Sequence, residues 1–253
     1  MTAFARALAL RSGYGPVPLT FPMRWLCLRA LREPVTRELQ LERVLLVHQS
    51  QAFAYTRPLG LERDYTIEVD ARRNPLAGGR ITMRATVRDG PGDTVLVAET
   101  LMRVVEGSAI APIPRRATPA PSSDIPALKT GPIDKAQTRR YAAAALDDNP
   151  LHHDPEAARA AGLDGPIVQG MLLAGQFESA LSAWRPDLRI GRLYAAFLRP
   201  LPVGGAIVVN SRIAQSTPAE AGDRLVVRLT VCNEADDIVC IGEVEGLAPG
   251  RPS

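Results

Sequence analysis

The stretch Tyr141-Ala-Ala-Ala-Ala-Leu-Asp-Asp-Asn-Pro-Leu-His-His-Asp154 holds two of the three histidines of the chain. Its alanine run favours a helix. That helix is expected to end within residues 146–148, because the proline that follows fixes its own φ and keeps the residue before it out of the helical region. Asp147 and His152 should therefore lie on an ordered loop just past the helix end. A carboxylate and an imidazole brought together on such a loop are suited to acid–base chemistry.

The same stretch resembles the signature of the MaoC-like (R)-specific enoyl-CoA hydratases, also called hydratase 2. The family pattern reads aromatic-Ala-x-Leu-Ser-Gly-Asp-x-Asn-Pro-Leu/Ile-His-x-Asp and continues to Ala-x-x-x-Gly-Leu/Phe-x-x-Pro-Ile-Ala-His-Gly-Met. Here the continuation is Ala160-Ala-Gly-Leu-Asp-Gly-Pro-Ile-Val-Gln-Gly-Met171. The resemblance thus runs over about thirty consecutive residues, from Tyr141 to Met171, with few gaps.

The resemblance implies roles for individual residues. Asp147 and His152 match the catalytic pair of the family, and Gly170 matches the glycine whose backbone N–H is the oxyanion donor. It implies (R)-specific hydration of a trans-2-enoyl thioester, or the reverse dehydration of an (R)-3-hydroxyacyl thioester, by a hydro-lyase of fatty acid metabolism. The residues expected to bind the substrate are Asn149, Gln169 and Met171.

Two positions differ from the family pattern. Its Ser-Gly before the aspartate is Ala145-Leu146 here, and its second histidine is Gln169. The first difference supports an alternative interpretation, a catalytically silent subunit that binds acyl thioesters. A hot-dog thioesterase is a further alternative, in which water attacks the thioester carbon, and the Asn-Pro-Leu-His spacing argues against it.

Simpler interpretations exist for each of these residues taken alone. Asp147 could bind loop amides or cap a helix, and His152 could be a structural histidine. His48 is expected to be structural, and Tyr141 to serve packing. Asn149 is expected also to order the loop, since asparagine side chains readily bond to nearby backbone. The residues expected in loops and caps are Asp148, His153 and Asp154.

The chain is expected to divide at a proline-rich connector. Residues 107–130 hold five prolines, which exclude a central strand or a long helix. We therefore predict a non-catalytic hot-dog over 1–106, a linker over 107–130 and a catalytic MaoC-like hot-dog over 131–253.

A short repeat supports a tandem arrangement. Tyr55-Thr-Arg-Pro-Leu59 in the first half matches Phe197-Leu-Arg-Pro-Leu201 in the second, and a strand-like run follows each. The first half, including Val47-His48-Gln49, resembles the N-terminal unit of double hot-dog dehydratases. It lacks the Asp-x-Asn-Pro-x-His pattern.

The expected fold class is α+β, a double hot-dog in which two units share one sheet around two central helices. The helix over 170–184 is apolar almost all round and should be buried. In the second half we expect helices over 134–145, 155–161 and 170–184, and strands near 190–198, 205–215, 224–233 and 238–245. In the first half we expect a helix over 21–31 and strands over 51–55, 64–71, 80–89 and 94–105.

Composition sets the remaining limits. The chain has 253 residues, 46% of them hydrophobic, and a formal net charge of +3. The sparse cysteines Cys27, Cys232 and Cys240 indicate a reducing compartment, so we expect a cytoplasmic protein. No metal spacing or nucleotide-binding glycine loop is present, and no metal or cofactor is expected beyond the thioester substrate.

The partners predicted are an acyl-CoA or acyl-carrier-protein thioester and a second copy of the chain in a homodimer. No membrane span and no nucleic-acid motif is found. Arginines outnumber acidic residues before residue 120. They indicate either a solvated surface or one that attracts the phosphates of coenzyme A.

Overall fold

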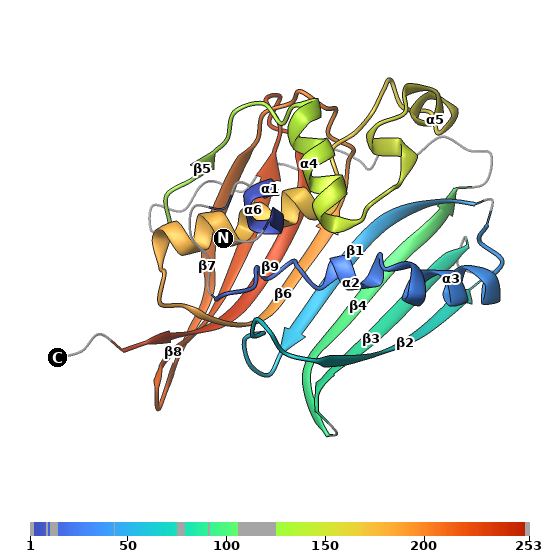
Figure 1. Ribbon diagram of the computed structural model, residues 1–253. Coiled ribbons are helices and arrows are strands. Elements are labelled where there is room, and N and C mark those ends of the chain that lie inside the picture. The colour runs from blue at the N-terminus through green and yellow to red at the C-terminus, as the bar shows by residue number, and fades with distance from the viewer. Residues whose placement is uncertain are drawn as a thin grey trace.

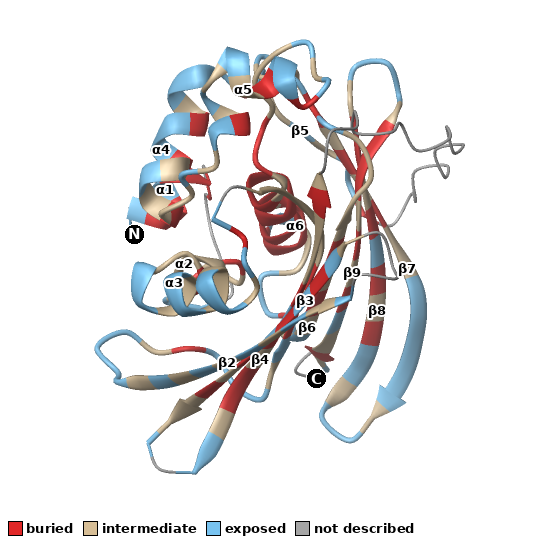
Figure 2. Cartoon of the chain, turned by 90° about the vertical axis from the view of Figure 1, so that its right-hand side faces the viewer, coloured by how far each residue is buried: buried red, intermediate tan, exposed pale blue. Residues whose placement is uncertain are grey.

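The computed structural model describes residues 3–8, 10, 15–42, 44–74, 79–90, 92–105 and 125–250. Its strands form one nine-stranded antiparallel sheet in the order β2-β3-β4-β1-β6-β9-β8-β7-β5. The described helices lie on one side of this sheet (Figure 1, Figure 2). The other face carries cross-strand ion pairs such as Arg84–Glu99 and Arg228–Glu243, so it faces solvent.

The elements follow the chain as two groups of strands, with some of the helices before the first group and the others within the second group. The first group is β1 (Leu45–Tyr55), β2 (Tyr65–Asn74), β3 (Arg80–Asp89) and β4 (Asp93–Val105). The second is β5 (Leu128–Lys129), β6 (Arg189–Phe197), β7 (Val208–Ala219), β8 (Gly222–Cys232) and β9 (Ile238–Pro249). The helices are α1 (Ala3–Ala7), α2 (Met23–Leu26), α3 (Arg29–Glu38), α4 (Lys135–Ala145), α5 (Pro155–Ala160) and α6 (Gly170–Trp184), with a 3-10 turn, η2, at Pro150–His152.

The two groups of strands repeat the same arrangement. Strands β1 and β6 meet in the sheet, where Ser50 pairs with Ala196 and Ala54 with Arg192. Outward from this junction the order is β1-β4-β3-β2 on one side and β6-β9-β8-β7 on the other. Tyr55 and Phe197, which open the sequence repeat, are the last residues of β1 and β6. The predicted pair of similar units sharing one sheet is confirmed.

Helix α6 is the central helix of the second unit and is buried as predicted. Leu172, Ala174 and Phe177 have no exposed surface. The ring of Phe177 packs so closely on β9 that a Cβ added to Gly242 would lie 2.3 Å from it. A helix that is apolar all round needs cover on every side.

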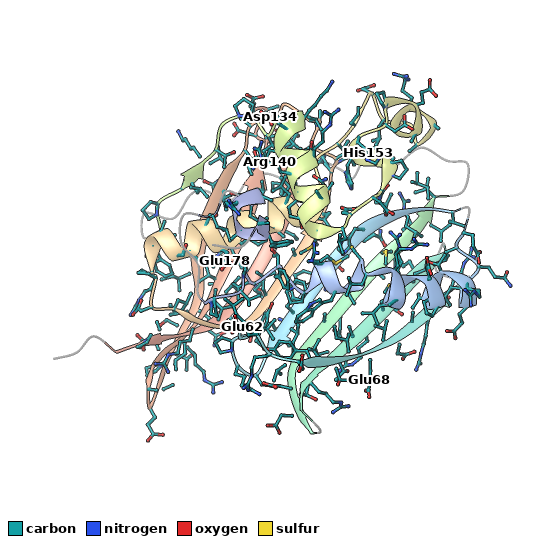
Figure 3. The ribbon with its side chains drawn as sticks, in the orientation of Figure 1. Glu62, Glu68, Asp134, Arg140, His153 and Glu178 are labelled. Carbon is teal, nitrogen blue, oxygen red and sulfur yellow. The ribbon has the colours of Figure 1, made fainter. Side chains whose placement is uncertain are left out.

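The N-terminal segment supplies part of that cover, which the sequence did not indicate. Leu8, just after α1, packs against Gly175 of α6, and its carbonyl oxygen accepts a hydrogen bond from the Gln176 amide at 2.9 Å. Glu178, also on α6 (Figure 3), accepts the Leu19 N–H at 2.8 Å. A five-residue helix has too little periodicity to be recognised from sequence alone.

The prediction of one helix over residues 21–31 is wrong, and so is the prediction of a second central helix. The segment forms two helices, α2 and α3, and α3 has no fully buried residue. The physical reason is composition, because α3 reads Arg-Ala-Leu-Arg-Glu-Pro-Val-Thr-Arg-Glu and presents only a narrow apolar stripe. Helix α3 therefore lies over the sheet of the first unit without filling the space beneath it.

Strand β1 is longer than predicted, starting at Leu45 rather than Gln51. Its pairing with β4 shifts register between His48 and Ser50, which marks a β-bulge. The bulge interrupts the alternation by which strands are recognised. It also changes the direction in which the side chains before it point.

The connector falls largely outside the described residues. Its described end contains β5, which pairs with β7 through Leu128–Val209 and Lys129–Val208. The domain boundaries at 106/107 and 130/131 stay a prediction.

Candidate active site

Helix α4 presents Asp147 through a left-handed residue. The helix starts at Asp134 (Figure 3), whose carboxylate accepts the Gln137 N–H at 2.7 Å. It ends at Leu146, which has φ 58° and ψ 31°. Glycine is favoured at such a position, and a residue with a Cβ costs about 1 kcal/mol more there. Leu146 thus adopts the conformation that suits the glycine of the family pattern, and the turn that carries Asp147 is kept.

Asn149 orders the loop after this turn. Its N–H donates to Asp147 Oδ1 at 3.2 Å, and its side-chain oxygen accepts the Leu151 N–H at 3.1 Å. Its side-chain nitrogen donates to the Leu46 carbonyl oxygen of β1 at 3.4 Å. The Asn149 side chain therefore ties the loop to the first unit, while its predicted contact with substrate stays a prediction.

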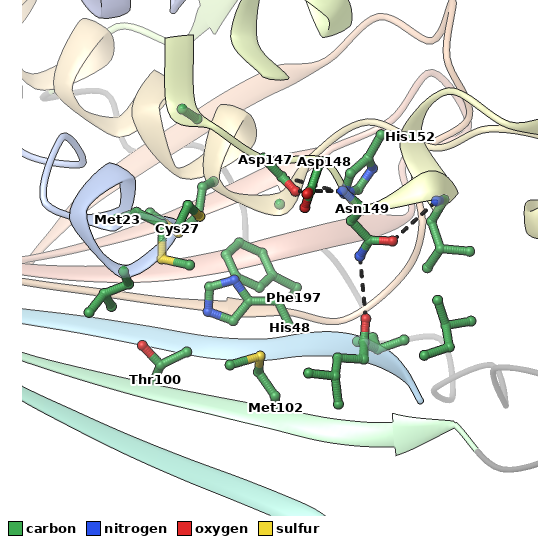
Figure 4. A pocket seen from close by; sticks show the side chains of 18 of the residues that line it. Met23, Cys27, His48, Thr100, Met102, Asp147, Asp148, Asn149, His152 and Phe197 are labelled. Atoms are coloured by element: carbon green, nitrogen blue, oxygen red, sulfur yellow. Dashed lines mark hydrogen bonds and ion pairs between the residues drawn. The ribbon is translucent and has the colours of Figure 1, made fainter. Parts of the chain in front are cut away.

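His152 faces Asp147 with a defined tautomer (Figure 4). Its Nδ1 lies 2.9 Å from the Ile167 carbonyl oxygen, which can only accept, so Nδ1 carries the hydrogen. Its Nε2 lies 3.7 Å from Asp147 Oδ2 and keeps a free lone pair in the neutral ring. The two side chains are 11% and 26% exposed, so they are shielded from bulk water yet reachable.

Two arginines of the first unit hold this loop. Arg24 donates to the Ala144 carbonyl oxygen at the end of α4. Arg32 of α3 binds both carboxylate oxygens of Asp148, with Nη2 3.0 Å from Oδ2. This guanidinium lowers the pKa of Asp148 and keeps it charged. The two contacts lie on either side of Leu146, the residue in the strained conformation.

Helix α6 begins beside the pair at Gly170. Its N-cap residue, Gln169, gives no side-chain cap, and within the described part of the chain the N–H groups of Gly170 and Met171 have no acceptor. A Cβ on Gly170 would lie 2.8 Å from the Phe197 ring, so glycine is required there for packing. Free N–H groups and the helix dipole make this end of α6 suited to a negative oxygen.

A cavity of about 820 Å³, here called the inner cavity, joins these groups. Asp147, His152, Gly170 and Met171 border it. It extends beneath α3 into the first unit, which follows from the missing second central helix. Its apolar walls include Met23, Leu26, Val44, Met83, Met102 and Leu173.

A second cavity of about 960 Å³, the outer cavity, lies between the start of α3 and α4. It shares Asp147, Asp148 and His152 with the inner cavity, so the two meet at the pair. Arg29, Arg32 and Arg139 also border it.

Gln169 does not border the inner cavity. It is 1% exposed, and its amide nitrogen donates to the Thr138 carbonyl oxygen of α4 at 3.1 Å. It borders the outer cavity instead. This side chain ties α6 to α4, and its predicted contact with substrate stays a prediction.

His48 is a residue of the inner cavity that sequence reasoning assigned to structure alone. Its Nε2 lies 3.1 Å from the Ser50 carbonyl oxygen, and its ring contacts Phe197 at 4.9 Å between centroids. Burial lowers its pKa to about 4, so the ring is neutral near pH 7. It lies at the bulge in β1, and a bulge leaves little trace in one sequence.

The thiol of Cys27 is held in its neutral form. Burial, with a smaller effect of Asp147, raises the pKa of the Cys27 thiol to about 12, so it is no thiolate nucleophile. Within the described residues, no three His, Cys, Asp or Glu side chains are placed to hold a metal ion. No helix of the described chain is long and apolar enough to cross a bilayer.

A family profile described as "MaoC like domain" matches residues 117–235, which contain the Asp147–His152 pair. The mitochondrial 3-hydroxyacyl-[acyl-carrier-protein] dehydratase of Arabidopsis thaliana is 31% identical over 118 residues, covering 44% of this chain and 68% of that protein. The chain belongs to the MaoC-like dehydratase family. Such MaoC-like proteins are hydro-lyases, enzymes that add water to a double bond or remove it.

A further relative and two solved structures are also similar to the chain. The (R)-specific enoyl-CoA hydratase of Aeromonas caviae is 29% identical over 102 residues, covering 40% of this chain and 64% of that protein. The HtdX structure from Mycobacterium tuberculosis has a TM-score of 0.70 at 22% identity, covering 97% and 94% of the two chains. A M. tuberculosis protein described as having a double hot-dog fold has a TM-score of 0.60 at 17% identity, covering 97% and 88%. The fold is therefore a double hot-dog, as predicted.

Proposed function

We propose that the chain hydrates trans-2-enoyl thioesters to (R)-3-hydroxyacyl thioesters and catalyses the reverse dehydration. The observation that carries this proposal is the Asp147–His152 pair, 3.7 Å apart and facing one cavity beside the uncapped start of α6. The names of the Arabidopsis and Aeromonas relatives support the same reaction.

The Asp147–His152 pair binds a water molecule and mediates two proton transfers. Water bound between Asp147 and His152 adds its oxygen to C3 of the enoyl group, and one proton reaches C2. The lone pair of His152 Nε2 and the Asp147 carboxylate are the groups through which these protons pass. The Ile167 carbonyl oxygen fixes the ring so that Nε2 points at the reaction.

The start of α6 stabilises the charge that this addition creates. Negative charge develops on the thioester carbonyl oxygen as water adds to C3. The Gly170 N–H, at the positive end of α6, donates to that oxygen, and a fixed donor of this kind lowers the barrier.

The two cavities define the orientation in which the substrate binds. The apolar inner cavity accommodates the acyl chain, and the outer cavity accommodates the arm that carries it. Arg29, Arg32 and Arg139 border the outer cavity, and guanidinium groups suit phosphate. Coenzyme A and the prosthetic group of an acyl carrier protein both bring phosphate to this place.

Hydration of crotonyl-CoA tests the proposal. We expect loss of the enoyl absorbance, formation of (R)-3-hydroxybutyryl-CoA and no release of free thiol. Recovery of the (S) isomer would exclude the reaction proposed here. Free coenzyme A would indicate the thioesterase, and binding without turnover would indicate a silent subunit. A panel of enoyl chain lengths on coenzyme A and on acyl carrier protein then defines the carrier.

A further inference from the structure

Tyr141 is a buried residue of α4 beside the site. It lies six positions before Asp147, its side chain is 1% exposed, and it borders the inner cavity. Its ring packs against Phe4, with centroids 5.6 Å apart. The family pattern asks only for an aromatic ring at this position, so packing accounts for the ring and leaves the hydroxyl unexplained.

The hydroxyl has no hydrogen-bond partner among the described residues. A few other buried side-chain atoms share this state, at Thr20, Gln49, Arg103, Gln169, Ser179 and Ser211. Of these atoms, only the Tyr141 hydroxyl belongs to a residue that borders the inner cavity. Buried hydroxyls are almost always paired, because an unpaired one loses its bonds to water without replacement.

The surroundings make this hydroxyl a donor. Burial, followed by the nearby charge of Asp147, raises the pKa of Tyr141 well above its usual value. The phenol therefore keeps its proton near neutral pH. What it lacks is an acceptor oxygen, and an acyl thioester brings one into the cavity.

We propose that the Tyr141 hydroxyl donates a hydrogen bond to an oxygen of the bound acyl thioester and is a further catalytic residue. The inference rests on the proposed function. Two oxygens of the substrate qualify, the thioester carbonyl oxygen and the oxygen that is added at C3. Tyr141 keeps its proton throughout, and its bond strengthens where negative charge builds up on the acceptor.

The substitution Tyr141→Phe removes the hydroxyl and keeps the ring. We expect kcat/KM for crotonyl-CoA to fall about 10- to 100-fold, the range for a lost bond to a charged oxygen. We also expect the urea midpoint of the free protein to stay the same or rise, because no partner within the protein is lost. Activity thus falls without a loss of stability, which a structural role would not produce.

Tyr55→Phe is the matched control. Tyr55 is half-buried, and its hydroxyl donates to the Leu19 carbonyl oxygen, so its bond lies within the protein. That residue does not border the inner cavity. We expect Tyr55→Phe to lower the urea midpoint and to leave kcat/KM within about twofold of the unmodified protein.

Inhibition constants separate the two candidate oxygens. Butyryl-CoA has the carbonyl oxygen only, whereas (R)-3-hydroxybutyryl-CoA has both. If Tyr141 binds the carbonyl oxygen, Tyr141→Phe weakens both ligands. If it binds the oxygen at C3, only the hydroxyacyl ligand is weakened.

The inference is overturned if Tyr141→Phe leaves kcat/KM and both inhibition constants unchanged. It is also overturned if the urea midpoint falls as in Tyr55→Phe, since the hydroxyl would then have a partner in the protein. A chain that binds these thioesters without turnover refutes the proposed function alone, and dissociation constants then decide the role of Tyr141. A chain that binds neither thioester refutes both.

Discussion

The catalytic pair is the residue-scale feature on which the function depends. Asp147→Asn and His152→Gln keep side-chain size while removing acid–base capacity. We expect each to lower kcat by 10²- to 10⁴-fold, the usual contribution of a general acid or base. Far-ultraviolet circular dichroism and the urea midpoint should stay unchanged. Near-normal turnover in either variant would contradict the mechanism.

The burial of His48 should make the stability of the protein depend on pH. Its pKa is about 4 in the folded protein and 6.5 in the absence of burial. Below pH 6.5 the unfolded chain binds a proton that the folded chain does not, so stability falls as pH drops from 6.5 toward 4. The loss amounts to at most about 3 kcal/mol.

His48→Phe removes this titration. Urea unfolding at pH 7 and pH 4.5 should show a smaller loss of unfolding free energy in the variant than in the unmodified protein. An equal loss in both proteins would place the acid sensitivity elsewhere.

At the scale of elements, α3 positions the catalytic loop through Arg32. We expect Arg32→Ala to lower kcat about tenfold, because a small displacement of a catalytic group is costly. The unfolding free energy should change by less than about 1 kcal/mol, since this ion pair is partly exposed. Arg84→Ala is the control, because Arg84 pairs with Glu99 on the solvent-facing side of the sheet and borders neither cavity. Equal kcat values in the two variants would refute this role of Arg32.

The contact between α6 and β6 gives a second prediction at this scale. The Cβ of Gly170→Ala would overlap the Phe197 ring, and overpacking of this kind costs about 1–3 kcal/mol. We expect lower stability and lower kcat/KM, because the start of α6 must move. Adding Phe197→Leu should restore part of the stability by making room. A stable, fully active Gly170→Ala variant would contradict the close packing.

For the whole molecule, the first unit should be required for folding of the second. A fragment of residues 128–253 would expose the edge of β6 that pairs with β1, and would lose the N-terminal cover of α6. We expect it to aggregate or self-associate, as open strand edges and apolar surfaces do. Light scattering checks this. A soluble, active monomeric fragment would show that the units are independent.

The homodimer stays a prediction, as does the cytoplasmic location. Two-fold dimers are the commonest assemblies of soluble proteins. Light scattering on the full chain tests the homodimer, and a measured mass equal to that of one chain would refute it.

The sequence by itself determined the parts whose cause is local. Pro150 keeps Asn149 out of the helical region, Asn149 bonds within its own segment, and the apolar run from Gly170 predicts a buried helix. The tertiary structure decided the rest, because those features depend on residues far apart in the chain. The bulge at His48 forms only when β1 pairs with β4, and the ion pair of Arg32 with Asp148 forms only when α3 lies beside the loop of the second unit. The space beneath α3 depends on how that helix lies over the sheet. Leu146 shows the limit most directly, since a single sequence gives no sign that surrounding contacts hold a leucine at positive φ.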